Sequence, residues 1–170
     1  MRTISLLLLR LSLGSLFFYA GIAKVLDPTW SAAFYLKGAK TFPAFYAFFL
    51  QPSTLPFINF INEWGLTLIG VALILGIFVR VASIGGIMLM LLYYFPILDG
   101  AYPNPHSLIV DEHIVYACAL FVLASFRAGR VFGLEKWCSN LPLCARFPRL
   151  RALLGQSPIL VLSFPRRAHP

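Results

Sequence analysis

Five of the six acidic residues stand at or near the ends of long apolar stretches, where a carboxylate could do proton chemistry. They are Asp27, Glu63, Asp99, Asp111 and Glu112, and Glu135 is the exception. A carboxylate in a lipid environment is costly, so it needs a partner or a function there. In apolar surroundings without a cation, carboxylates tend toward a raised pKa and become suited to proton transfer. These acids mark the first candidate for a functional site.

The richest of these positions is the triplet Asp111-Glu112-His113, at the start of the last apolar stretch. Successive residues on a helix turn by about 100°, so Asp111 and His113 would point to nearly opposite faces of a helix. We therefore expect Glu112 to face inward with Tyr116 and one neighbour. Alternatively, the helix begins at the triplet, and the acids then simply complement the positive end of its dipole.

The first apolar stretch carries a polar and small-residue face. Arg10, Gly14, Phe17, Gly21 and Lys24 recur at spacings of four and three residues and so share one side of a helix. Glycines allow another helix to approach closely. The cations at the two ends of this face should contact protein or extend toward the membrane surface.

The second apolar stretch carries a matching polar face. Its members are Asn59, Asn62, Glu63, Thr67 and Gly70. Because Lys24 and Glu63 both lie near the outer ends of their helices, an ion pair between them is the simplest way to satisfy both charges.

The composition is that of a membrane protein. Hydrophobic residues make up 59% of the 170 positions and charged residues only 12%, with a mean hydropathy of +0.82. Soluble domains average roughly 45–50% apolar and about 25% charged residues. The net charge of +8 does not indicate nucleic-acid binding, because most of the excess follows the last apolar stretch and no nucleic-acid motif accompanies it.

Four apolar stretches are long enough to cross a membrane, which takes about 20 residues. They cover residues 4–26, 57–79, 81–98 and 108–126. The last could begin earlier, with Asn104 as a cap and Pro105 in the first turn. The sequence therefore predicts an all-α membrane protein, a bundle of four transmembrane helices with a tight turn at Arg80.

The distribution of Lys and Arg predicts the orientation, because cytoplasmic flanks carry the excess of positive charge. Eight of the 14 Lys and Arg residues follow Phe126. The C-terminus should therefore be cytoplasmic, and with four crossings the N-terminus is cytoplasmic too. The clustered acids then lie on the outer side.

Two segments outside the spans differ in character. The outer loop, residues 27–56, is rich in aromatic residues, which prefer the headgroup zone. We expect one or two short helices there, either anchored at the interface or folded over the mouth of the bundle.

We divide the chain into a membrane domain, residues 1–137, and a cytoplasmic tail, residues 138–170. The tail is basic and rich in Pro and Arg, so we expect poor order and attraction to anionic lipid.

We expect no intrinsic metal, haem or flavin. His113 is the single histidine in a predicted span, and the sequence has no Glu-x-x-His motif or paired histidines on separate helices. No glycine-rich strand-to-helix turn suggests a nucleotide site. The three cysteines form no C-x-x-C pair.

Three segments of the chain, in order, match the pattern of a known family. They are Leu8-Leu-Arg10-Leu with Gly14 and Ala20-Gly-Ile-Ala-Lys24, then Asn62-Glu-Trp-Gly-Leu-Thr-Leu-Ile-Gly70 with Ala72-Leu-Ile-Leu-Gly76 and Arg80, and finally Asp111-Glu-His113. Residues 8–137 thereby resemble the DoxX family. The resemblance implies a four-helix bundle in a prokaryotic inner membrane. It also implies kinship with DoxD, the membrane subunit of thiosulfate:quinone oxidoreductase, although no domain resembling its second subunit is present.

The first functional hypothesis is a quinone-linked oxidoreductase subunit that acts with a redox partner. A quinone needs an apolar cleft, donors for its carbonyls and groups that exchange protons. The candidate catalytic residues are Glu63, Glu112 and His113. The candidate substrate contacts are Lys24, Asn62, Trp64, Tyr116 and Asp111.

The second hypothesis is a non-catalytic accessory or scaffold protein of the membrane that docks a redox partner, with the charged set as a structural ion network. A small transporter is disfavoured by the four helices and the lack of an inverted repeat. The expected partners are the lipid bilayer and a soluble or membrane redox subunit. A quinone is the expected electron acceptor, and any other electron-carrying cofactor would belong to the partner.

Overall fold

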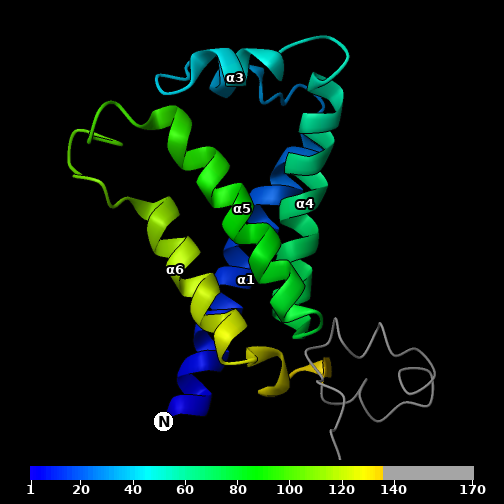
Figure 1. The fold of residues 1–170 in the computed structure, drawn as a ribbon. Helices are drawn as coiled ribbons and strands as arrows, with labels where there is room; N and C mark the ends of the chain where they lie inside the picture. The colour runs from blue at the N-terminus through cyan, green and yellow to red at the C-terminus, as the bar shows by residue number, and fades with distance from the viewer. Residues whose placement is uncertain (136–170) are drawn as a thin grey trace, which may run out of the picture.

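The computed structural model describes residues 1–135, which are largely helical (Figure 1). The helices are α1 (Arg2–Leu26), α2 (Ala33–Lys37), α3 (Pro43–Phe48), α4 (Leu55–Leu75), α5 (Val79–Ile97), α6 (Glu112–Ser125) and the 3-10 helix η1 (Ala128–Arg130). Three of them, α1, α4 and α5, are long and apolar enough to cross a membrane. Helix α6 is apolar but has only 14 residues, fewer than the predicted fourth span. The predicted tail, residues 138–170, lies outside the described part.

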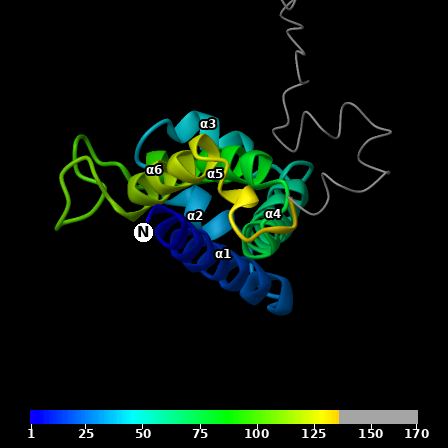
Figure 2. The ribbon, with the colours of Figure 1, turned by 90° about the horizontal axis from the view of Figure 1, so that it is seen from below.

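The apolar helices pack in two pairs, α1 with α4 and α5 with α6 (Figure 2). The predicted small-residue face of α1 is buried, with Arg10, Gly14, Phe17 and Gly21 all among its buried residues. A Cβ atom on Gly21 would lie 2.3 Å from the backbone nitrogen of Thr67 on α4. The α1–α4 contact is therefore backbone against backbone and depends on glycine.

The turn between α4 and α5 lies a few residues before the predicted one. Gly76 ends α4 with φ 67°, a left-handed conformation that glycine adopts without steric cost. Phe78 precedes α5 with φ 51°, and Arg80 is already in the first turn of α5. The predicted turn at Arg80 is wrong because the reversal needs only the three residues after Leu75.

Helix α6 begins at the acidic triplet and not near Leu108 or at Asn104, so that prediction is wrong. Asp111 is its N-cap, and the Asp111 Oδ1 atom accepts hydrogen bonds from the backbone N–H groups of His113 (3.0 Å) and Ile114 (3.2 Å). Asn104 instead accepts from the backbone of His106 within the preceding loop. The alternative prediction, a helix that starts at the triplet, is the one the structure supports.

Two short helices, α2 and α3, occupy the long loop between α1 and α4, and α3 lies across one end of the bundle (Figure 1). We call residues 30–50 the cap segment. Its buried residues Ala32, Leu36 and Tyr46 form a second hydrophobic cluster, apart from the main core. The cap segment is fastened to the end of α5 by polar contacts. These are Lys40 N–H to the Pro96 carbonyl (2.9 Å), Thr41 Oγ1 to the Leu98 carbonyl (2.5 Å) and Tyr46 hydroxyl to the Leu92 carbonyl (3.2 Å).

At the opposite end of the bundle, Arg10 holds the segment that follows α6. Its Nη1 atom donates to the carbonyls of Ala128 (2.8 Å) and Val131 (2.9 Å), and its side chain is buried. The backbone N–H of Glu135 donates to the Gly76 carbonyl at 3.0 Å. The predicted contact between Arg10 and protein groups is therefore confirmed, with backbone carbonyls as the partners.

Candidate functional site

A cavity of about 500 Å³ lies between the cap segment and the neighbouring ends of the long helices. Most of its walls are apolar or aromatic, among them Trp30, Phe49 and Leu89. The polar groups that line it come from different elements. They are Lys24 of α1, Ser31, Tyr35 and Tyr46 of the cap segment, Asn62 of α4, Tyr93 of α5 and His113 of α6. An apolar pocket with a few convergent polar groups is the usual form of a small-molecule site.

Lys24 contacts aromatic rings where the sequence predicts an ion pair. Its Nζ atom lies 4.9 Å from the centroid of the Trp30 ring and 5.4 Å from that of Tyr93. Among residues 1–135, Lys24 and Glu63 are not within ion-pair distance, so the predicted pair is wrong. The reason is helical geometry, because Asn62 faces the cavity and the next residue is rotated by about 100°. Glu63 is only partly buried.

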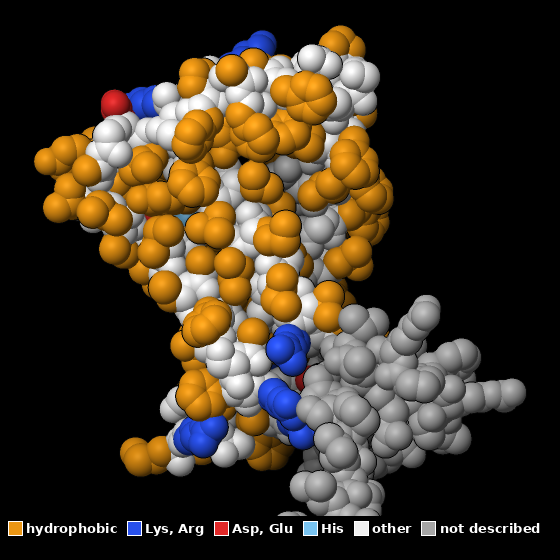
Figure 3. All heavy atoms as spheres, in the orientation of Figure 1, with side chains coloured by type: hydrophobic (Ala, Val, Ile, Leu, Met, Phe, Trp, Pro, Cys, Tyr) orange, Lys and Arg blue, Asp and Glu red, His pale blue; other side chains and the backbone are white. Residues whose placement is uncertain are grey.

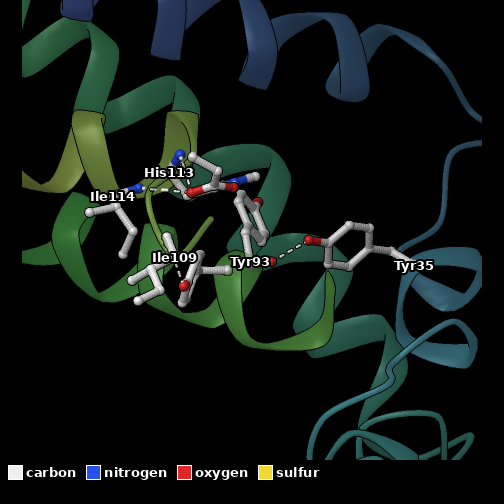
Figure 4. Close-up of polar contacts among 7 residues, drawn as sticks. Tyr35, Tyr93, Ile109, His113 and Ile114 are labelled. Atoms are coloured by element: carbon white, nitrogen blue, oxygen red, sulfur yellow. Dashed lines mark hydrogen bonds and ion pairs between the residues drawn. The ribbon is translucent and has the colours of Figure 1, made fainter. Parts of the chain in front are cut away.

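Three polar side chains link the cap segment to α4 and α5. The Tyr93 hydroxyl donates to Asn62 Oδ1, and Asn62 Nδ2 donates to the Ile58 carbonyl at 2.8 Å. The Tyr35 hydroxyl donates to the Tyr93 carbonyl (Figure 4). Burial is the main cause that raises the pKa of Tyr35, with smaller contributions from Tyr46 and nearby acids. Tyr35 therefore stays a hydrogen-bond donor over the physiological pH range.

Asp111 and His113 form a pair at the edge of the cavity. His113 Nδ1 lies 2.6 Å from Asp111 Oδ2, and the Asp111 side chain is almost fully buried (Figure 4). The predicted placement on opposite faces is wrong, because Asp111 is the extended cap residue and turns its carboxylate back over the first helical turn. Glu112, predicted to face inward, is exposed.

The remaining predicted site residues lie away from the cavity lining. Trp64 is 42% exposed on the outside of α4. Tyr116 packs edge-to-face against Phe17, with ring centroids 6.4 Å apart. The cavity thus brings together Lys24, Asn62 and His113, with Asp111 behind the histidine.

The sequence interpretation did not single out Tyr35 or Tyr93. Tyr93 lies three residues before Pro96, near the end of the third apolar stretch, and Tyr35 lies in the aromatic outer loop. Pro96 is a signal that could have drawn attention to this part of α5, because a proline inside a helix leaves the carbonyl four residues earlier without its helical partner. In the described residues 1–135, no group of three or more His, Cys, Asp or Glu side chains could hold a metal ion.

The outer surface agrees with a membrane environment. Hydrophobic side chains cover the middle of the visible face, and Lys and Arg side chains gather toward its ends (Figure 3). Large apolar residues remain exposed on each long helix, for example Leu8, Leu68 and Met88. These features define a multi-pass helical membrane protein with an apolar cavity at one end.

The chain belongs to the DoxX family, whose family model, described as DoxX, matches residues 5–97, more than half of the chain. The matched part contains α1, the cap segment, α4 and α5. The predicted family resemblance is thereby confirmed, while Asp111 and His113 lie beyond the matched residues. No curated protein and no solved structure matches the chain.

Proposed function

We propose that this chain is the membrane subunit of a quinone-linked redox system, similar to thiosulfate:quinone oxidoreductase, and that its cavity binds the quinone ring. The observation that carries the proposal is the cavity itself. Its volume of about 500 Å³ and its aromatic walls suit a flat apolar ring, and its polar groups suit the ring's carbonyl oxygens. Any further electron carrier would belong to a partner subunit.

The Asp111–His113 pair is the best candidate for proton exchange with a bound quinone. A carboxylate that accepts from Nδ1–H fixes the orientation and the tautomer of the ring. The Nε2 atom can then exchange a proton with a ligand oxygen in the cavity. This pair takes over the role that the sequence suggested for Glu63 and Glu112, neither of which lines the cavity.

We place the cavity on the outer side of a prokaryotic inner membrane, with both termini in the cytoplasm. Exposed arginines support this orientation, because they lie at the end of the bundle opposite the cap segment. They are Arg2, Arg80, Arg127 and Arg130. On the cap side, Lys40 is offset by its ion pair with Asp99 at 2.9 Å.

The test is quinone binding to the full chain in lipid nanodiscs. Decylubiquinone should quench the fluorescence of Trp30, which lines the cavity, in a saturable way; a Trp64→Phe background reduces the unrelated signal. His113→Leu should weaken binding about tenfold, the effect of roughly 1.4 kcal/mol. Glu112→Gln, a change at the exposed neighbour, should leave binding intact. Absence of saturable quenching would reject the quinone site.

A second candidate function is a non-catalytic accessory protein that docks a redox partner. The observation that favours it is the apolar outer surface of the cap segment, where Phe42 is 61% and Phe48 is 53% exposed. In that case, Phe42→Ser with Phe48→Ser, at two residues outside the cavity lining, should abolish co-purification of the partner without changing quinone quenching. The quinone proposal predicts instead that His113→Leu impairs activity while partner recovery stays normal.

A further inference from the structure

We infer that the cavity selects a quinone ring carrying an anionic oxygen, such as an ionised hydroxyquinone, and that Lys24 is the residue that recognises this oxygen. The inference rests on the proposed function and specifies the ligand of the same site. It follows from the surroundings of one side chain and from the balance of charge around the cavity.

The Lys24 ammonium is held without an oxygen acceptor. Its close contacts are the faces of Trp30 and Tyr93, at 4.9 and 5.4 Å from the ring centroids. Within residues 1–135, Lys24 makes no side-chain hydrogen bond or ion pair. A lysine ammonium has three N–H donors. An aromatic face attracts the positive charge but offers no oxygen or nitrogen lone pair as a hydrogen-bond acceptor. The donors of Lys24 are therefore available to a ligand in the cavity.

The acids near the cavity are engaged elsewhere. Asp111 uses Oδ1 on two backbone N–H groups and Oδ2 on His113. Glu63 does not line the cavity and acts on Lys24 only at longer range. The lining thus presents one cation, a histidine and neutral donors, with no free carboxylate among the described residues that line it.

An anionic oxygen on a flat ring matches this lining in two ways. The ring fits the aromatic walls, and the charged oxygen would give Lys24 the charge-assisted hydrogen bond that the protein does not. A neutral quinone carbonyl can also accept from Lys24, but it lacks the ion-pair contribution. In apolar surroundings the difference between the two is larger than in water.

The experiment compares two ligands that differ in one methyl group. 2-Hydroxy-1,4-naphthoquinone is an anion at neutral pH, whereas 2-methoxy-1,4-naphthoquinone cannot ionise. Binding of each to the full chain is measured by tryptophan quenching in nanodiscs of zwitterionic lipid, so that the membrane does not favour the anion. We expect the hydroxy compound to bind at least about tenfold more tightly.

Three lysine variants test whether Lys24 causes the preference for the anionic ligand. Lys24→Met should bring the two dissociation constants together, whereas Lys37→Met, at an exposed lysine of the cap segment, should keep the wild-type preference. Lys24→Arg retains the charge and should retain the preference, which covers the case in which Lys24→Met does not fold. Thermal melting of each variant separates loss of binding from loss of structure.

The outcomes separate this inference from the proposed function. Equal binding of the two ligands by the wild type, or an unchanged preference in Lys24→Met, overturns the inference and leaves quinone binding standing. If neither naphthoquinone nor decylubiquinone binds saturably, the proposed function fails as well. Loss of the preference in Lys24→Met alone establishes Lys24 as the specificity-determining residue.

Discussion

Asp111 has two separable jobs at the start of α6. Its Oδ1 atom caps the helix, and its Oδ2 atom holds His113 at 2.6 Å. The first job concerns stability and needs only an acceptor oxygen. The second concerns the orientation and tautomer of the imidazole and needs a carboxylate. Asp111 therefore has both a structural role, as the helix cap, and a proposed chemical role, as the partner of His113.

Asparagine and alanine at position 111 should separate these jobs. Asp111→Asn keeps a capping oxygen, so the free energy of unfolding should change little, but it removes the carboxylate oxygen that holds His113 Nδ1. Asp111→Ala removes the cap as well and should cost about 1–2 kcal/mol. Thermal melting and quinone quenching measured on both variants check the prediction. Equal quenching by Asp111→Asn and wild type would show that the pair is only structural.

Among the cationic residues, Arg10 should be the one whose substitution lowers the free energy of unfolding most. Its guanidinium donates to the carbonyls of Ala128, Val131 and Phe132, all in the segment after α6. Arg10→Leu leaves buried carbonyls without donors and should lower the free energy of unfolding by at least about 1.5–3 kcal/mol. Arg10→Lys should restore only part of the lost stability, because an ammonium cannot reproduce the planar set of N–H donors of a guanidinium.

The matched control for Arg10 is Arg80→Leu, which removes an exposed arginine from the same end of the bundle. It should melt within about 0.5 kcal/mol of the wild type, as surface substitutions usually do. The comparison is made by thermal melting in one detergent. An Arg10→Leu variant as stable as Arg80→Leu would contradict the structural role.

Some of these residue roles could be predicted from the sequence. The spacing of Arg10, Gly14 and Gly21 gave their shared buried face, because helical periodicity alone decides it. The Asp111–His113 pair could not be predicted in this way, because it depends on α6 starting at Glu112, four residues after the predicted start of the span at residue 108. The partner of Lys24 was also missed, because aromatic rings compete with Glu63 and only the fold of the loop brings Trp30 to the lysine.

At the scale of elements, Pro96 explains why the cap segment binds where it does. A proline inside a helix removes the N–H that would bond to the carbonyl four residues earlier. Here that carbonyl belongs to Leu92, and the Tyr46 hydroxyl of the cap segment donates to it at 3.2 Å. Pro96 thus leaves the Leu92 carbonyl free to accept a hydrogen bond that attaches the cap segment to α5.

A double-mutant cycle tests this coupling. Tyr46→Phe should cost about 0.5–1.5 kcal/mol, because the Leu92 carbonyl loses its donor. In a Pro96→Ala background the new backbone N–H can bond to the same carbonyl, so the cost of Tyr46→Phe should shrink. Unfolding free energies of the four proteins give the coupling directly. Additive effects would show that Tyr46 and Pro96 act independently.

The α1–α4 contact should tolerate no side chain at Gly21 or Gly70. A Cβ atom on either would lie 2.3 Å from a backbone nitrogen of the facing helix, that of Thr67 or Phe18. Gly21→Ala and Gly70→Ala should each destabilise the bundle by about 1–3 kcal/mol, because the two backbones must move apart.

Gly85→Ala is the matched control for these substitutions. Its Cβ would make an ordinary contact, 3.8 Å from Ile69 Cδ1. Alanine also favours a helix over glycine by about 0.8–1 kcal/mol. Thermal melting should therefore show Gly85→Ala at or above the wild type. Equal melting of Gly21→Ala and Gly85→Ala would be inconsistent with the close α1–α4 approach.

For the whole molecule, the sequence predicted the helical class and the long spans, because apolar length is a strong signal. It did not give the true extent of α6. With 14 residues, α6 is about 21 Å long at 1.5 Å per residue. The helix is therefore shorter than the roughly 30 Å of a hydrocarbon core. The residues before it, Leu108, Ile109 and Val110, are apolar and exposed but not helical, and Ile109 is left-handed with φ 59°.

The apolar composition of α6 and of the residues before it favours a fourth crossing, which can be tested by cysteine labelling. Single cysteines replace Gly38, Arg80 or Arg130 in a chain whose three cysteines are changed to serine. An impermeant maleimide added to intact cells should label only the cysteine at 38, because the proposed orientation puts the cap segment outside. The cysteines at 80 and 130 should react only after lysis. Each position is exposed in the structure, so access to the reagent depends on the membrane alone. Labelling at 130 but not at 80 in intact cells would mean that α6 does not cross, and labelling at 80 but not at 38 would invert the proposed orientation.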